Sequence, residues 1–311
     1  MRHGSLVSLL AAVLVAACSG GSTSQAPPAA TSSPAATSSP AASGGPEILP
    51  LLINSEIIKG PNRFLFSLTD PQNKLVAAPD VKVHLLFYDV DTAENQVVFE
   101  DDARFLWAIK DVQGLYVASV DFPDAGRWGT RFEATFPDGN VKTVRADYDV
   151  AASGSTPPLG ASVPSVDTPT LADVGGDVKQ VSTDKEPDPR FYTTSIADAL
   201  AARKPFVVAF ATPAFCETRL CGPTLETVKA VAKDYPSLTF INVEPYRMVF
   251  RDGSLQPELD AGSQLQPAEW TNAWGLRSEP YTFVIAADGT VAAKFEGVLG
   301  EDELRAALDA L

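Results

Sequence analysis

Residues 19–46 limit most strongly what this chain can fold into, because they cannot contribute to a packed core. They contain no charged residue and no aromatic residue, and five prolines lie among Ser, Thr, Ala and Gly. Such a segment buries too little apolar surface to offset the entropy of ordering it. Proline stiffens it locally without folding it. We therefore predict a disordered tether over residues 18–46 and a folded part that begins near residue 47.

The segment before the tether has the layout of an export signal. Arg2 supplies a positive start, and residues 6–17 are almost wholly apolar but too short to span a bilayer, which takes about 20 residues. The stretch Val15-Ala16-Ala17-Cys18 resembles the lipobox of bacterial lipoproteins. That resemblance implies that residues 1–17 are removed and that Cys18 is acylated, which anchors an extracytoplasmic protein to the membrane. The alternative is a plain signal peptide in which Cys18 occurs by chance.

Charge and histidine content exclude several classes of function. The 311-residue chain has a net charge of −15, whereas nucleic-acid binding needs a basic face. It has two histidines, His3 and His84, and His3 falls in the predicted signal. Multi-histidine metal sites and Ser-His-Asp or Cys-His catalysis are therefore nearly excluded. We predict no nucleic-acid partner, no cofactor and no metal.

Residues 47–150 have the pattern of a β domain. Short runs of β-branched and aromatic residues alternate with turn signals, and Pro137-Asp138-Gly139-Asn140 is a typical hairpin turn. Six or seven such strands in about 100 residues predict an antiparallel β-sandwich, and the segment 114–128 resembles the end of immunoglobulin-like extracytoplasmic modules. We expect His84 to be a structural strand histidine. Trp107, Tyr116 and Trp128 are expected in the core.

The pattern changes twice after residue 150. Residues 151–190 are rich in Ser, Pro, Gly, Thr and Asp and are predicted to be a linker, the later part of which could pack onto the next domain. Residues 191–311 then alternate helical and strand patterns. The predicted order is a helix over 195–202, a strand over 206–211, a helix over 224–233, a strand over 238–243, a helix over 267–274, a hairpin over 281–295 and a helix over 301–311.

This order resembles the thioredoxin fold. Three features carry the resemblance: a cysteine motif between the first buried strand and a helix, the segment from Glu279 to Ile285, and the closing hairpin at Asp288-Gly289. The resemblance implies an α/β thioredoxin-like domain over 191–311, a cis peptide before Pro280, and a redox pair formed by Cys216 and Cys221. Its partners would be extracytoplasmic protein thiols or disulfides.

The spacing of the cysteines leaves the attacking residue open. Thioredoxins have two residues between their cysteines, and this chain has four. Counted from the strand, Cys216 is the nucleophile, and counted from Gly222-Pro223, Cys221 is. Cys216 is the preferred choice. A helix N-terminus lowers a thiol pKa, Arg219 could stabilise a thiolate, and Glu279 would oppose it.

The two cysteines also have interpretations other than redox activity. A structural disulfide in a non-enzymatic adaptor is the main alternative, although so short a loop restricts the unfolded chain little. Sco-type copper chaperones add a distal histidine, which this chain lacks after His84. Peroxiredoxins place a threonine close before the reactive cysteine, but Thr212 lies four residues before Cys216, which does not match that pattern well. Residues 244–266 are predicted to be a long loop that could cover the cysteines.

Overall fold

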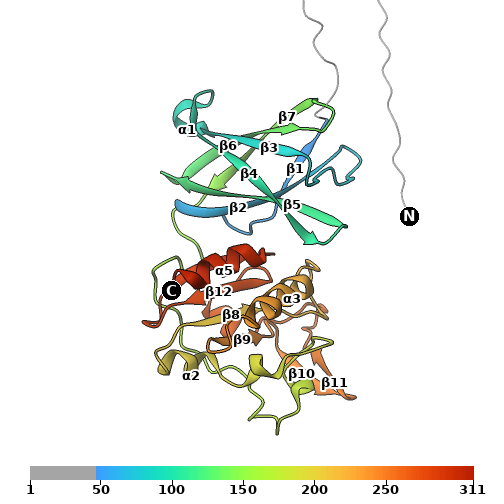
Figure 1. Ribbon diagram of the computed structural model, residues 1–311, viewed down its shortest axis with the longest axis vertical. Helices are drawn as coiled ribbons and strands as arrows, with labels where there is room; N and C mark the ends of the chain where they lie inside the picture. Colours follow the sequence, from blue (N-terminus) through green and yellow to red (C-terminus); the bar gives the residue numbers. More distant parts are fainter. Residues whose placement is uncertain (1–46) are drawn as a thin grey trace, which may run out of the picture. The chain divides into compact units, whose positions relative to one another are not determined.

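The computed structural model describes residues 47–311 (Figure 1). The predicted signal peptide, Cys18 and the tether lie outside the described residues. No helix within 47–311 is both long enough and apolar enough to span a membrane. The described part is mostly β-sheet and has few helices.

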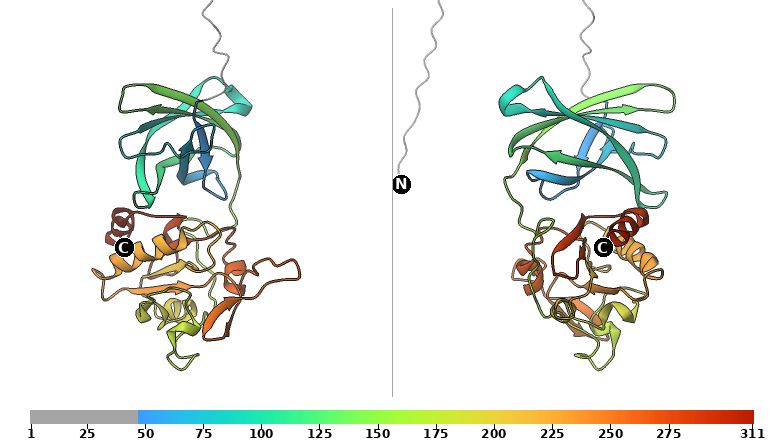
Figure 2. Two further views of the ribbon diagram at one scale, coloured as in Figure 1. Left: turned by 90° about the vertical axis from the view of Figure 1, so that its right-hand side faces the viewer. Right: turned by 60° about the vertical axis from the view of Figure 1, so that its left-hand side comes forward.

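The first region is a single antiparallel sheet of seven strands. In chain order the strands are β1 (Leu49–Leu52), β2 (Gly60–Thr69), β3 (Lys82–Asp89), β4 (Val97–Ile109), β5 (Gln113–Phe122), β6 (Gly126–Thr135) and β7 (Val141–Val150), with a short helix α1 (Val90–Ala93) between β3 and β4. Their order in the sheet is β1-β2-β5-β4-β3-β6-β7. The sheet curls so far that it nearly closes on itself (Figure 2).

The predicted antiparallel β-rich domain is confirmed, and it is compatible with an immunoglobulin-like fold. The two separate sheets of a sandwich are replaced by one sheet because β4 is unusually long. Its first half, up to Ala103, pairs with β3, and its second half, from Arg104, pairs with β5. A strand shared in this way joins what would otherwise be two sheets.

Aromatic side chains fill the interior of this sheet. Phe66 is fully buried and lies edge-on to Phe132, with ring centroids 4.9 Å apart. Phe87 stacks on Phe99 at 4.4 Å. Of the predicted core residues, Tyr116 and Trp128 are buried, whereas Trp107 is only partly buried. Alternation along the strands points these rings to one face, where their burial supplies the main stabilising free energy.

The second region is built on a four-stranded mixed sheet of order β13-β12-β8-β9. Its elements are α2 (Ile196–Ala201), β8 (Phe206–Phe210), α3 (Cys221–Ala232), β9 (Thr239–Val243), α4 (Glu269–Ala273), β12 (Tyr281–Ile285), β13 (Val291–Glu296) and α5 (Glu301–Asp309). Strands β8 and β9 are parallel and are connected through α3, whereas β12 is antiparallel to β8. The central strand β8 is buried throughout, as its apolar run predicts.

Helices cover both faces of this sheet. Val207 and Ala209 of β8 pack with the apolar sides of α3 and α5, while Phe206, Val208 and Phe210 pack with α2 and with Trp274 at the end of α4. Trp274 is fully buried and Trp270 is partly buried, so both contribute to packing. Helices packed on both faces of the sheet hold β8 and β9 in place. The cysteines follow the C-terminal end of β8.

The segment before this sheet is partly ordered along it. Two short 3-10 helices, η1 (Val178–Gln180) and η2 (Pro189–Tyr192), lie within or next to the predicted linker. Leu171, Val174 and Val181 pack into the same apolar cluster as α3 and α5. The later part of residues 151–190 is therefore packed onto the second region.

Residues 244–266 contain a hairpin that the sequence analysis did not predict. Its strands are β10 (Met248–Arg251) and β11 (Ser254–Pro257), which pair antiparallel to each other and to no other strand (Figure 1). The positive-φ pair Asp252 and Gly253 makes its tight turn. The expected long loop is thus partly regular structure.

Candidate functional site

Cys216 and Cys221 form a disulfide at the beginning of α3. Their Cα atoms are 5.9 Å apart, which is within the range that a disulfide spans. Cys221 is the first residue of this 12-residue helix and is fully buried, whereas Cys216 lies in the preceding loop and is partly exposed. Helix α3 therefore begins three residues earlier than predicted, and the second cysteine stands in its first turn.

The sulfur of Cys216 accepts a hydrogen bond from the first turn of helix α3. The backbone N–H of Cys221 donates to Cys216 Sγ at 3.1 Å, and the hydroxyl of Thr218 lies 3.3 Å from the same sulfur. The N–H groups in the first turn of a helix have no partner within the helix and carry its positive dipole end. The N–H of Cys221 and the helix dipole would stabilise negative charge on Cys216 if the disulfide were reduced.

Arg219 does not fulfil the role considered for it from the sequence. Its side chain is exposed, and its backbone has a positive φ of 64°. Within residues 47–311 it forms neither an ion pair nor a side-chain hydrogen bond with the cysteines. The positive field at Cys216 therefore comes from the backbone N–H groups at the start of α3.

Glu279 lies beside the two sulfur atoms. One carboxylate oxygen of Glu279, Cys216 Sγ and Cys221 Sγ are all within 4.8 Å of one another. Oε1 accepts a hydrogen bond from the backbone N–H of Glu217 at 2.8 Å, and Oε2 accepts one from the hydroxyl of Tyr246 at 2.8 Å. Burial raises the pKa of Glu279 above its usual value, which those two hydrogen bonds oppose.

Pro280 follows Glu279, and the peptide bond between them is cis, which confirms the sequence-based expectation. The hydroxyl of Thr218 donates to the carbonyl oxygen of Glu279 at 2.9 Å. This bond ties the cysteine loop to the chain that leads into β12. The structure thus brings Cys216, Cys221 and Pro280 into one small part of the second region.

A second buried carboxyl, Glu244, lies directly after β9. Because β8 and β9 are parallel neighbours, Glu244 comes at the same edge of the sheet as the loop that leads to Cys216. The backbone N–H of Thr183 donates to Glu244 Oε1 at 2.6 Å, and the hydroxyl of Thr183 accepts from the N–H of Ala214. Burial raises the pKa of Glu244 to about 7.

Glu244 and its contact with Thr183 were not predicted from the sequence. One feature of the sequence could have indicated that Glu244 is a site residue: it is a carboxylate directly after a buried strand. The carboxyl ends of such strands line the binding sites of α/β proteins. Tyr246, two residues later, was likewise not recognised as a partner of Glu279. Segment 244–266 thus reaches the cysteine site through Tyr246.

Comparisons with known proteins assign no family. No protein-family model matches the chain, and no curated protein matches it. The soluble domain of PmoD from Methylocystis sp. ATCC 49242 (Rockwell) is 14% identical, with 35% of this chain and 94% of that chain covered and a TM-score of 0.24. MtrC from Shewanella baltica OS185 is 13% identical, with 48% and 28% covered and a TM-score of 0.24. Similarities this low carry no argument about fold or function.

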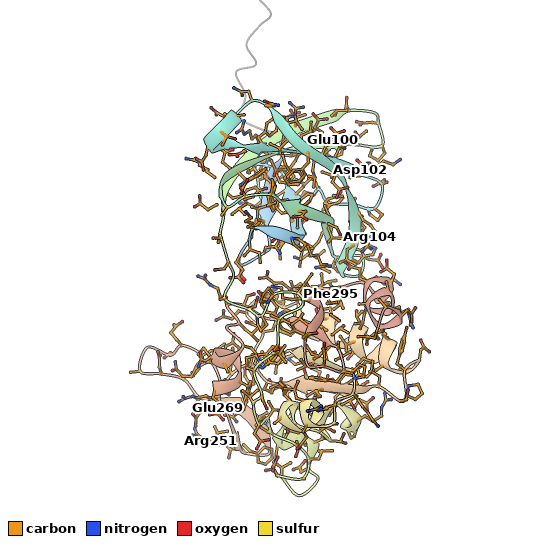
Figure 3. The ribbon with its side chains drawn as sticks, turned by 90° about the vertical axis from the view of Figure 1, so that its left-hand side faces the viewer. Glu100, Asp102, Arg104, Arg251, Glu269 and Phe295 are labelled. Carbon is orange, nitrogen blue, oxygen red and sulfur yellow. A yellow bond between two sulfur atoms is a disulfide. The ribbon has the colours of Figure 1, made fainter. Side chains whose placement is uncertain are left out.

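His84 lies in the first region, away from the cysteine motif in sequence. Its Nδ1 is 2.8 Å from Asp102 Oδ1 and its Nε2 is 3.6 Å from Glu100 Oε2. Both acids belong to β4, along which Glu100, Asp102 and Arg104 follow one another (Figure 3). The hydrogen bond with Asp102 raises the pKa of His84. These exposed contacts join side chains on neighbouring strands, which agrees with a structural role for His84 in the sheet.

Proposed function

We propose that this chain is a lipid-anchored extracytoplasmic protein whose thioredoxin-like second region performs thiol–disulfide exchange through Cys216 and Cys221. The observation that carries the proposal is the environment of Cys216. Cys216 is a partly exposed residue just before helix α3, and its sulfur accepts a hydrogen bond from the N–H of Cys221. The mixed sheet, with its parallel β8–α3–β9 unit and antiparallel β12–β13 hairpin, supports the thioredoxin-like assignment.

Accessibility favours Cys216 as the attacking residue. Its thiolate would attack one sulfur of a substrate disulfide, forming a mixed disulfide and releasing the other substrate sulfur as a thiolate. The thiolate of Cys221, buried beneath it, would then attack Cys216 Sγ. That step forms the Cys216–Cys221 disulfide and releases the second substrate thiol. The same steps in reverse oxidise a substrate dithiol.

A trapping experiment tests this division of roles. The full-length chain is prepared with Cys18→Ser, so that Cys216 and Cys221 are its only cysteines. Adding Cys221→Ser should give a stable mixed disulfide with a disulfide-bonded peptide, because no resolving thiol remains. Adding Cys216→Ser in its place should give little or none. Equal trapping by both variants, or by neither, would contradict the proposal.

The competing proposal is a binding protein in which the disulfide only fixes the loop before α3. The complete burial of Cys221 is the observation that favours it. On that account, neither single-cysteine variant would be trapped by substrate, and the native disulfide would exchange slowly with small thiols.

The anchor is proposed from the sequence, on the lipobox resemblance at Cys18 and the uncharged, proline-containing segment that follows it. Growth of cells with a labelled fatty acid should label the natural chain and leave a Cys18→Ser variant unlabelled. An unlabelled natural chain would instead support a plain signal peptide.

A further inference from the structure

We infer that, when its disulfide is reduced, this chain binds one Zn²⁺ ion through Cys216 Sγ, Cys221 Sγ and a carboxylate oxygen of Glu279. This inference requires that the disulfide can be reduced. It does not require that the cysteines exchange with a substrate, so it stands apart from the proposed function.

The spacing of the three ligand atoms fits a zinc site. All three lie within 4.8 Å of one another. Zinc binds thiolate sulfur at about 2.3 Å and carboxylate oxygen at about 2.0–2.2 Å, so ligand atoms that share a tetrahedral zinc are about 3.5–3.8 Å apart. Once the S–S bond is broken, rotations about the two Cα–Cβ bonds suffice to separate the sulfurs to that distance.

The carboxylate is already held in place by its own hydrogen bonds. Tyr246 donates to Oε2 and the N–H of Glu217 donates to Oε1, each at 2.8 Å. Each carboxylate oxygen retains a second lone-pair position, and one of these can bind a metal. Partners of this kind orient a ligand before the metal arrives, and they raise affinity by reducing the entropy lost on binding.

The charge around Glu279 supplies an independent reason for a cation. Its side chain is only 5% exposed, and within residues 47–311 it forms no ion pair with a lysine, an arginine or a histidine. A buried carboxyl without a cationic partner is costly in its ionised form. A divalent ion bound between the carboxylate and the two thiolates would lower that cost, because it reduces the net charge of the three ligands from −3 to −1.

The three ligand atoms favour zinc over other divalent ions and leave one coordination position open. Two thiolates with one carboxylate suit a borderline-soft ion such as Zn²⁺ better than the hard ions Mg²⁺ or Ca²⁺, which prefer oxygen ligands. Three protein ligands leave the fourth tetrahedral position to water, and the partly exposed Cys216 marks the side from which the ion enters. The thiols release their protons as zinc binds, so the apparent affinity rises with pH.

A zinc titration tests the inference. The full-length Cys18→Ser chain is reduced with a phosphine, freed of reductant, and titrated with Zn²⁺ against a chromophoric chelator. One ion per chain is expected for the reduced protein and none for the oxidised protein. Co²⁺ in place of Zn²⁺ should give the sulfur-to-metal absorption of thiolate ligation. A reduced chain that binds no more zinc than its Cys216→Ser variant would overturn the inference.

Variants test the third ligand. Glu279→Gln should weaken zinc binding at least about tenfold. The matched control is Glu269→Gln, because Glu269 is an exposed carboxylate at the start of α4 that forms no contact with the three ligands. That control should bind zinc as the parent does. An unchanged affinity in Glu279→Gln would overturn the proposed ligand set.

If Glu279→Gln does not fold, a second variant tests whether Glu279 is the third ligand. Tyr246→Phe removes only the hydroxyl that holds Glu279, and it should weaken zinc binding several-fold without changing the stoichiometry. Unchanged zinc affinity in folded Tyr246→Phe would then contradict the role of Glu279. Mixed-disulfide trapping is measured separately, so a failure of zinc binding and a failure of exchange are distinguishable.

Discussion

The two regions of this chain bury different kinds of side chain. The seven-stranded sheet of residues 47–150 buries aromatic rings, and its acidic side chains lie at least partly exposed. Among residues 47–311, the buried carboxylic acids are Glu244 and Glu279, and both lie in the second region at the edge of the sheet that carries the cysteines. Burying an ionisable group costs stability, so this difference separates a region built for packing from one built around a site.

The largest expected effect comes from the cysteine site itself. Cys216→Ser should reduce thiol–disulfide turnover to the uncatalysed rate, because the attacking sulfur is gone. Turnover is measured with a disulfide-bonded peptide and glutathione. Phe66→Leu, a packing change confined to the first region, should leave the rate unchanged. A strong loss of turnover in Phe66→Leu would show that the two regions are not separable in function.

The packing of the first region is tested by Phe66→Ala. Phe66 is fully buried between Phe64, Tyr116 and Phe132, so its loss should lower the free energy of unfolding by about 3–5 kcal/mol. Leu51→Ala is the control, because Leu51 is 52% exposed and its truncation should change stability by about 0.5 kcal/mol or less. Urea unfolding of both variants measures the difference. Similar losses would mean that the rings do not form the core.

The buried acid Glu244 should give the second region a distinctive pH dependence. Its pKa is about 7 when folded and near 4.5 when unfolded, so the folded chain holds a proton that the unfolded chain loses. The contribution of this group is therefore present below about pH 4.5 and is lost as pH rises through 7, by about 3 kcal/mol in all.

Urea unfolding from pH 5 to pH 8 measures that dependence. Glu244→Gln should be less sensitive to pH over this range, because the glutamine cannot ionise. Glu269→Gln removes an exposed acid and should keep the parental slope. A parental slope in Glu244→Gln would show that Glu244 does not titrate differently in the folded chain.

The smallest expected effect concerns a helix end of the second region. Ser195 caps α2 by accepting the N–H of Asp198 at 3.1 Å. Ser195→Ala should cost about 1 kcal/mol, whereas Thr194→Ala, one residue outside the cap, should cost less. Equal losses in thermal unfolding would mean that Ser195 does not act as the cap.

Local patterns predicted much of this architecture. The alternating runs gave the strands of the first region, and the hairpin at Pro137–Asn140 connects β6 to β7. The apolar run of β8 and the cap at Ser195 also agree with the structure. The single curled sheet was not predictable, because it depends on how one long strand, β4, divides its pairing between two neighbours.

The site was predicted only in part, for a similar reason. Cys216, Cys221 and Pro280 were recognisable from motif and order along the chain. The contacts of Glu279 with Tyr246, and of Glu244 with Thr183, join residues 33 and 61 positions apart. No local pattern encodes such contacts, and the hairpin β10–β11 that follows Tyr246 was hidden in a polar segment without clear alternation.

The reduction potential of the Cys216–Cys221 disulfide tests the central claim most directly. It is measured on the full-length Cys18→Ser chain by thiol trapping in glutathione and dithiothreitol buffers. Thiol–disulfide exchange predicts a potential between about −120 and −270 mV with fast equilibration, and the value would show whether the protein acts as oxidant or reductant. A potential below about −300 mV with slow exchange would contradict the claim and mark the disulfide as structural.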